Sequence, residues 1–114
     1  MKPATLKALN ASIAHWERLA KNGPSEKEHA DSISCALCRR FNPFHAKHPC
    51  QKALGERCPV FKRTGEPNCG ETPFDTAAEL TDFKGLLVPG VTLAEWRAAA
   101  RRELAFLRSL LPKP

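Results

Sequence analysis

The cysteines of this chain are concentrated in one stretch, and that stretch constrains the fold more than any other feature. All five cysteines of the 114-residue sequence lie within residues 35–74. Cys35 and Cys38 are separated by two residues, a spacing at which both thiolates can bind one tetrahedral Zn²⁺ ion. This pair supplies half of a zinc site. The sequence therefore predicts that the other ligands lie further along the same stretch.

Two more cysteines complete the predicted site. Cys58 is followed by a proline and Cys69 by a glycine, and both neighbours favour the tight turns that metal-ligand loops need. We predict one structural zinc ion with four thiolate ligands, Cys35, Cys38, Cys58 and Cys69, and with Cys50 as the alternative ligand. Four thiolates leave no open coordination position for water or substrate, which argues against hydrolysis at the metal.

A disulfide scaffold is the alternative use of these cysteines, because small cysteine-rich chains are often secreted. Two observations disfavour it. The N-terminus carries no apolar signal segment. The number of cysteines is also odd, so pairing them would leave one thiol over. We therefore expect a metal site rather than disulfides.

A wider pattern surrounds the cysteines. It consists of a His-Trp pair, a Cys-x-Leu-Cys motif, a Cys-Pro-Val motif, a Thr-Gly pair, and a cysteine followed by Thr-Pro-aromatic. The residues of this pattern are His15, Trp16, Cys35, Leu37, Cys38, Cys58, Pro59, Val60, Thr64, Gly65, Cys69, Thr72, Pro73 and Phe74. Together they resemble a group of small uncharacterised proteins encoded by tailed bacteriophages.

The resemblance covers roughly residues 15 to 74 and departs from the group at one cysteine. In the group, a cysteine usually lies closer to the Cys-Pro pair than Cys50 lies to Cys58. The role of Cys50 is therefore less certain than the roles of the matching cysteines. The resemblance implies a phage or prophage origin, and hence the cytoplasm of a bacterial host, but it implies no activity.

The length and the charge bound the remaining possibilities. A chain of 114 residues fits a single domain over residues 1–114, and no apolar run is long enough to span a membrane.

Residues 35–74 hold seven bases and three acids, so this stretch carries +4 of the formal charge of +6. Such a basic stretch suits an acidic protein surface or nucleic acid. The candidate contact residues in it are Arg39, Arg40, Lys62 and Arg63.

Helical patterns occupy both ends of the chain. Residues 1–22 carry apolar side chains at spacings of three or four, and residues 92–111 open with Thr92 and Glu95, which form a capping box. Each helix contributes one tryptophan to its apolar stripe. The sequence therefore predicts an all-α, small, irregular zinc-stabilised domain, in which the terminal helices pack together around a loop-rich metal centre.

Two further capping-box patterns predict shorter helices. Ser25 with Glu28 would start a short helix that ends near residue 31, and Thr76 with Glu79 would cap a helix within residues 72–85. Ala77, Leu80, and Phe83 or Lys84 would set the period of that second helix.

The C-terminal helix has an unusually broad apolar surface. Its main stripe runs from Leu93 through Trp96 to Leu111, and further apolar residues lie beside it, which predicts either packing on two sides or contact with a partner. Arg97, Arg101 and Arg108 lie along one flank of the stripe. They form either a solvated edge or an anion-binding ridge.

We expect a protein-interaction module rather than an enzyme. His45 and His48 give a weak nuclease-like pattern, because no histidine after Cys69 completes a metal site. The favoured function is a small zinc-binding phage-type protein that binds, and inhibits or modulates, a host protein. The alternative is a small basic nucleic-acid-binding protein that uses residues 35–74. The aromatic interleaving of single-strand binders is missing from this stretch.

Overall fold

The computed structural model describes residues 1–25, 27–30, 36–41, 57–65 and 72–112, without the side chains of Cys38 and Arg39. The described residues form an all-α structure, in which the only β-type pairing is an isolated bridge between Thr81 and Leu87. The helices are α1 (Pro3–Asn22), α2 (Ala36–Phe41), α3 (Pro59–Thr64), α4 (Pro73–Ala78) and α5 (Leu93–Ser109). The mostly helical character predicted from the sequence is confirmed.

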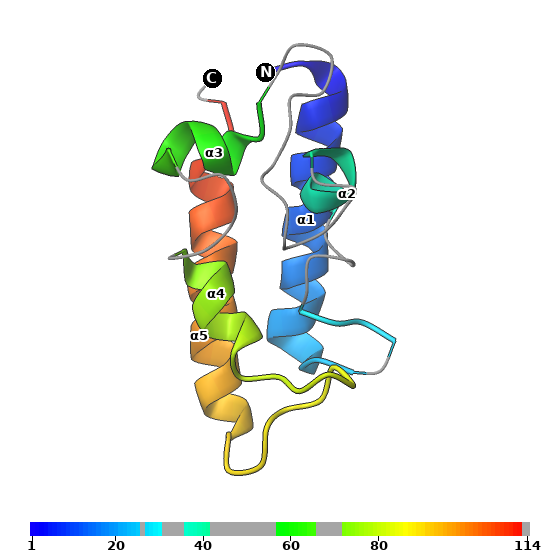
Figure 1. Cartoon of the computed structure of the whole chain (residues 1–114), viewed down its shortest axis with the longest axis vertical. Coiled ribbons are helices and arrows are strands. Elements are labelled where there is room, and N and C mark those ends of the chain that lie inside the picture. The colour runs from blue at the N-terminus through cyan, green and yellow to red at the C-terminus, as the bar shows by residue number, and fades with distance from the viewer. Residues whose placement is uncertain (26, 31–35, 42–56, 66–71, 113–114) are drawn as a thin grey trace.

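The two long helices, α1 and α5, lie side by side and run in opposite directions (Figure 1). Trp16 of α1 and Trp96 of α5 are 1% and 0% exposed, and their rings stack with centroids 6.1 Å apart. The indole N–H of Trp96 donates a hydrogen bond of 2.8 Å to the carbonyl oxygen of Leu19. The prediction that the terminal helices pack together, each giving one tryptophan to the core, is confirmed.

The bounds of α1 follow from its sequence. Pro3 stands in the first turn, where its missing N–H costs nothing, and the helix ends at Asn22. Gly23 follows with a φ of 79°, which suits a residue without a side chain, and its N–H donates to the Leu19 carbonyl. The predicted helix over residues 1–22 is thus confirmed to within two residues.

Helix α5 begins at the predicted capping box. The Thr92 hydroxyl accepts a hydrogen bond from the Glu95 N–H, and the Glu95 carboxylate accepts one from the Thr92 N–H. Its broad apolar surface is held on two sides, since α1 packs on one part of it and α4 on another. Phe74 of α4 completes this core by meeting the Trp16 ring edge to face.

Leu93 is the exception on the apolar stripe of α5. The sequence places it in the core, but it is 42% exposed. Helix α1 ends at Asn22, so the chain opposite Leu93 is Gly23, which offers no side chain to cover it. Leu93 therefore marks the end of the core and not a part of it.

The helix predicted over residues 72–85 is shorter than expected. Helix α4 ends at Ala78, and Thr76 lies inside it rather than capping it. Beyond α4, the Asp82 carboxylate accepts hydrogen bonds from the N–H groups of Lys84 and Leu86. These local bonds compete with helical ones and turn the chain, so the prediction for residues 79–85 is wrong.

The capping box predicted at Ser25 and Glu28 starts no helix in the described residues 27–30. The Ser25 hydroxyl does accept from the N–H of Glu28 at 3.1 Å. The Glu28 carboxylate, however, is hydrogen-bonded to His15 and Arg18 of α1 instead of to the backbone of Ser25. Tertiary contacts thus override the local pattern.

Two short helices, α2 and α3, each of six residues, occur where the sequence predicts loops and single turns. Helix α2 packs against α1, where the buried Ser12 hydroxyl accepts from the Leu37 N–H at 3.2 Å. Helix α3 lies near the C-terminal end of α5 (Figure 1). Arg63 of α3 fixes this position, because its guanidinium donates to the side chain and the carbonyl of Ser109.

Candidate functional site

Most of the predicted zinc ligands lie outside the described part of the chain. Cys35, Cys69 and the alternative ligand Cys50 belong to the residues that the structure does not describe, and so does the side chain of Cys38, whose backbone lies in α2. Only Cys58 is described with its side chain. No group of three or more metal-binding side chains occurs among the described residues. The metal centre therefore stays a prediction.

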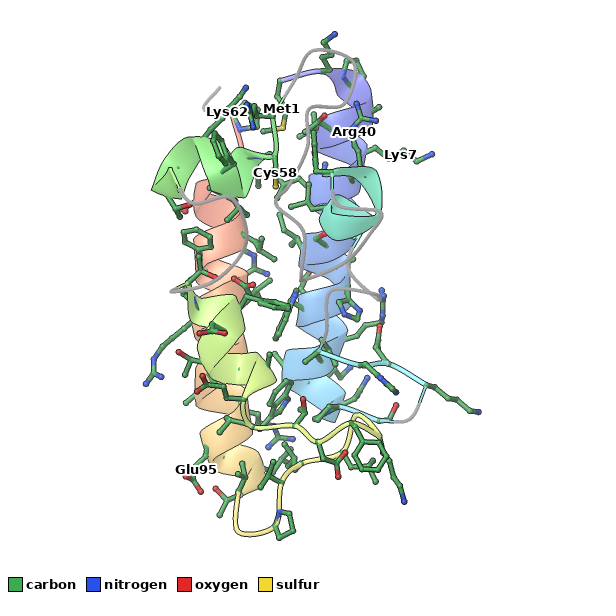
Figure 2. All side chains as sticks on the ribbon, in the orientation of Figure 1. Met1, Lys7, Arg40, Cys58, Lys62 and Glu95 are labelled. Atoms are coloured by element: carbon green, nitrogen blue, oxygen red, sulfur yellow. The ribbon has the colours of Figure 1, made fainter. Side chains whose placement is uncertain are left out.

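Cys58 lies in a position suited to a structural ligand. It directly precedes α3 and is 4% exposed. It belongs to the same buried cluster as Leu37 and Phe41, which lie on either side of Cys38 in α2. Figure 2 shows Cys58 between α3 and the side of the molecule formed by α1 and α2. Cys58 and the flanking residues of Cys38 thus belong to the same core, and the structure describes no distance between the two predicted ligands.

The nuclease-like pair has no described geometry, because His45 and His48 both lie outside the described residues. Nothing in the structure bears on a hydrolytic role for them. The assignment as a non-enzyme stays a prediction that rests on the sequence.

The four basic contact candidates are not equivalent. The side chain of Arg39 lies outside the described part of the chain. Arg40 donates to the Thr5 hydroxyl at 3.0 Å, and Arg63 binds Ser109, so both guanidinium groups hold the fold together. Lys62 is exposed on α3, at the end of the molecule where Met1 also lies (Figure 2). Lys62 and Arg63 are both exposed, but the guanidinium of Arg63 is engaged with Ser109.

The buried His15 forms a partly exposed polar network that the sequence does not predict. Its Nε2 lies 3.0 Å from the carbonyl oxygen of His29, and its Nδ1 lies 3.0 Å from the Glu28 carboxylate. Both partners are hydrogen-bond acceptors, so both ring nitrogens can donate only when the imidazole is protonated. The network ties residues 27–30 to the middle of α1.

The carboxylate of Glu28 is the anionic member of this network. Partial burial acts to raise its pKa, but hydrogen bonds from Arg18 and His15 and the charges of these two residues outweigh that effect. The pKa of Glu28 is therefore lowered from its ordinary value of 4.5. The Arg18 Nε donates to it at 2.8 Å, which completes a contact between three side chains.

A projecting aromatic residue is the most unusual feature of the surface. Phe83 is 91% exposed, the highest value of any large apolar side chain in the described residues. It stands on residues 81–87, which we call the Phe83 turn. The sequence predicts Phe83 or Lys84 on the inner face of a helix, and that prediction is wrong because the helix ends at Ala78.

The Phe83 turn is held by its own hydrogen bonds. The Asp82 N–H donates to the Leu86 carbonyl at 2.8 Å, and the Gly85 N–H donates to the Asp82 carbonyl at 3.0 Å. Gly85 is buried with a φ of 84°, and a Cβ there would lie 2.5 Å from the His29 ring. Close packing on His29 thus requires glycine and fixes the turn against residues 27–30.

The base of the Phe83 turn is anchored in the core. Leu80, directly before the turn, and Leu87, its last residue, pack against the buried cluster, and the Val88 N–H donates to the Leu80 carbonyl at 2.9 Å. Phe83 is therefore exposed on a fixed support and not on a loose loop.

Comparison with known proteins adds no relative: no protein-family model, no curated protein and no solved structure matches this chain. None of the described helices is long and apolar enough to cross a membrane.

Proposed function

We propose that this chain is a small zinc-binding protein of bacteriophage type that binds a host protein in the host cytoplasm and inhibits or modulates it. The observation that carries the proposal is the exposure of Phe83 on a rigid turn. Aromatic anchors dominate the energetics of many protein interfaces, and a preorganised anchor loses little conformational freedom on binding.

The surroundings of Phe83 support a protein partner. Leu86 on the same turn is 39% exposed and extends the apolar surface. The Lys84 amine lies 5.9 Å from the centre of the Phe83 ring, so a cation stands beside the apolar anchor. An apolar anchor with a charged neighbour is typical of the core and rim of an interface.

The proposed zinc ion would be structural. Four cysteines would hold it: Cys35, Cys38, Cys58 and Cys69, with Cys50 as the alternative. The burial of Cys58 in the same core cluster as Leu37 and Phe41 of α2 supports this ligand set. A tetrathiolate centre would connect the segment before α2 with the segment before α3, and it would leave the surface free for binding.

A comparison of two variants tests the proposal. Tagged wild-type protein, Phe83→Ala and Lys84→Ala would each be used to capture proteins from a nuclease-treated bacterial lysate, and captured proteins would be identified and purified. We expect a specific host protein that binds wild-type with a dissociation constant at or below about 1 μM. Phe83→Ala should weaken that binding at least about 30-fold, as for a hot-spot residue, and Lys84→Ala should weaken it much less.

Two results would contradict the proposal. One is capture of the same proteins by wild-type and Phe83→Ala with equal affinity. The other is capture that occurs from a parallel untreated lysate but not from the nuclease-treated one, which would assign the interaction to nucleic acid. Because Phe83 is almost fully exposed, its replacement should leave the fold unchanged, and circular dichroism checks that.

A further inference from the structure

A second surface lies between the two long helices. A groove of about 560 Å³ separates one edge of α1 from α5. Its charged lining consists of Lys21, Arg97, Arg101 and Arg108 on the basic side and Glu17 on the acidic side. We call this surface the basic groove. It shares no residue with the Phe83 turn or with the predicted zinc ligands.

The arginines line up because of their spacing. Arg97, Arg101 and Arg108 are four and seven residues apart, so at about 100° per residue they lie within about 40° of each other around α5. At a rise of about 1.5 Å per residue, they extend over about 16 Å of the helix. Since α1 passes beside them, they form one wall of a groove rather than scattered surface charges.

The floor of the groove is apolar and closed. Ala20 of α1 and Leu104 of α5 lie between the charged side chains, and each is 8% exposed. None of the described residues that line the groove is aromatic. A ligand would therefore meet cations along a shallow apolar floor and would find no ring on which a base could stack.

Contacts within the chain neutralise only part of the positive charge of the basic groove. Arg97 donates to the carbonyl oxygen of Lys21 at 3.3 Å, and no ion pair joins it to a carboxylate among the described residues. Arg108 reaches Glu17 at 3.3 Å, but both side chains are about half exposed, and such pairs are weak. Arg101 is exposed and makes no hydrogen bond or ion pair within the described part of the chain.

We propose that the basic groove binds the sugar–phosphate backbone of double-stranded nucleic acid without reading its sequence. A row of guanidinium groups matches a row of phosphates better than a single anion, because each guanidinium can bind one phosphate bidentately. The formal charge of +6 attracts any polyanion over a distance. The lack of an aromatic platform among the described residues of the groove favours a duplex over a single strand.

The test is a fluorescence-anisotropy titration of a short random-sequence duplex at about 50 and about 200 mM salt. Three or four phosphate contacts predict a log–log salt slope of about −2.7 to −3.6, so binding should weaken about 40-fold to 150-fold between these conditions. Arg101→Glu should weaken binding about tenfold or more at the lower salt concentration, because at least one contact is lost.

Arg102→Glu is the matched control. Arg102 lies next to Arg101 on the same helix, but it faces Thr72 and Thr76 on the α4 side. The two variants have the same net charge, so only a site in the groove predicts that Arg101→Glu weakens binding much more. Glu17→Gln should tighten binding, since it removes the one carboxylate among the described residues that line the groove.

Three outcomes would overturn the proposal. Equal weakening by Arg101→Glu and Arg102→Glu would mean that net charge alone is responsible. Polyglutamate that competes as well as the duplex would assign the groove to an acidic protein surface. Equal or tighter binding of a single strand of the same sequence would refute the proposal that the groove prefers a duplex. Circular dichroism of each variant confirms that the fold is kept.

Discussion

Replacement of Trp96 tests the core that joins the two terminal helices. The side chain is fully buried, stacks on Trp16 and donates a hydrogen bond to Leu19. Trp96→Ala would leave a large cavity and should cost about 3–5 kcal/mol of the free energy of unfolding. Domains of this kind have a total of about 5–15 kcal/mol, so this variant risks unfolding altogether. Trp96→Phe is therefore the more informative change.

The cost of Trp96→Phe can be estimated from its contacts. The lost hydrogen bond is worth about 1 kcal/mol. The Leu19 carbonyl is not left unpaired, because it also accepts from the Gly23 N–H at 2.9 Å. The smaller ring loses about 1 kcal/mol more in buried apolar area, at about 25 cal/mol per Å². We expect a total of about 2 kcal/mol.

Urea denaturation measured by circular dichroism gives this free energy directly. Phe83→Ala is the control, since removal of an exposed aromatic ring should change stability by less than about 0.5 kcal/mol. Iodide quenching of wild-type fluorescence provides a second measurement, because two buried indoles should be protected. A loss below about 0.5 kcal/mol in Trp96→Phe, or quenching as strong as that of free indole, would refute the packing of α1 on α5.

Three further predictions concern the N-terminal cap of α5, the network of His15, Arg18 and Glu28, and the proposed zinc site. Thr92→Ala removes the capping hydroxyl of α5 and should cost about 1 kcal/mol in urea denaturation, whereas Thr92→Ser should cost little. Glu28 has a lowered pKa in the folded state, so it stabilises the fold above its unfolded value of 4.5, and this contribution is lost as the pH falls below that value. Glu28→Gln should therefore flatten the acid limb of the stability curve, and an unchanged limb would exclude the network as its cause. Elemental analysis should find one zinc ion per chain, and Cys35→Ser should lose both metal and fold, while Cys50→Ser keeps them. Zinc-free wild-type protein, or zinc lost in Cys50→Ser and kept in Cys58→Ser, would show that the ligand set is wrong.

The long helices could be predicted because their signals agree with each other. Helix α5 has a capping box at Thr92, a sustained apolar period and a proline after its end. Helix α1 has a proline in its first turn and a glycine directly after Asn22. Each signal is small, but all point to the same element, so the bounds are correct to within two residues.

A capping-box pattern by itself does not predict the start of a helix. The same pattern occurs at Ser25, Thr76 and Thr92, and only the last one starts a helix. A cap contributes about 1 kcal/mol, which a tertiary contact can exceed. At Ser25, the required carboxylate of Glu28 is held by His15 and Arg18, and those partners could not be known before α1 was placed.

The basic groove shows a different limit of sequence reasoning. The spacing of Arg97, Arg101 and Arg108 does place them on one flank of α5. Whether that flank is open or paired depends on the position of Glu17 and Lys21, which lie about 80 residues away in the chain. A helical wheel of one segment cannot contain this information.

The error at the end of α4 and the missed surface residue have one physical cause. If the helix continued through residue 85, Phe83 would follow Leu80 by three residues and would share its buried face. Instead, the Asp82 carboxylate accepts two backbone N–H groups, the chain turns, and Gly85 takes a φ of 84° against the His29 ring. Leu80 stays on the core while Phe83 is turned out to solvent. The position of an aromatic residue three places along a helical period is therefore decided by one short acidic side chain and one glycine. These two residues are what convert a core pattern into an exposed apolar surface.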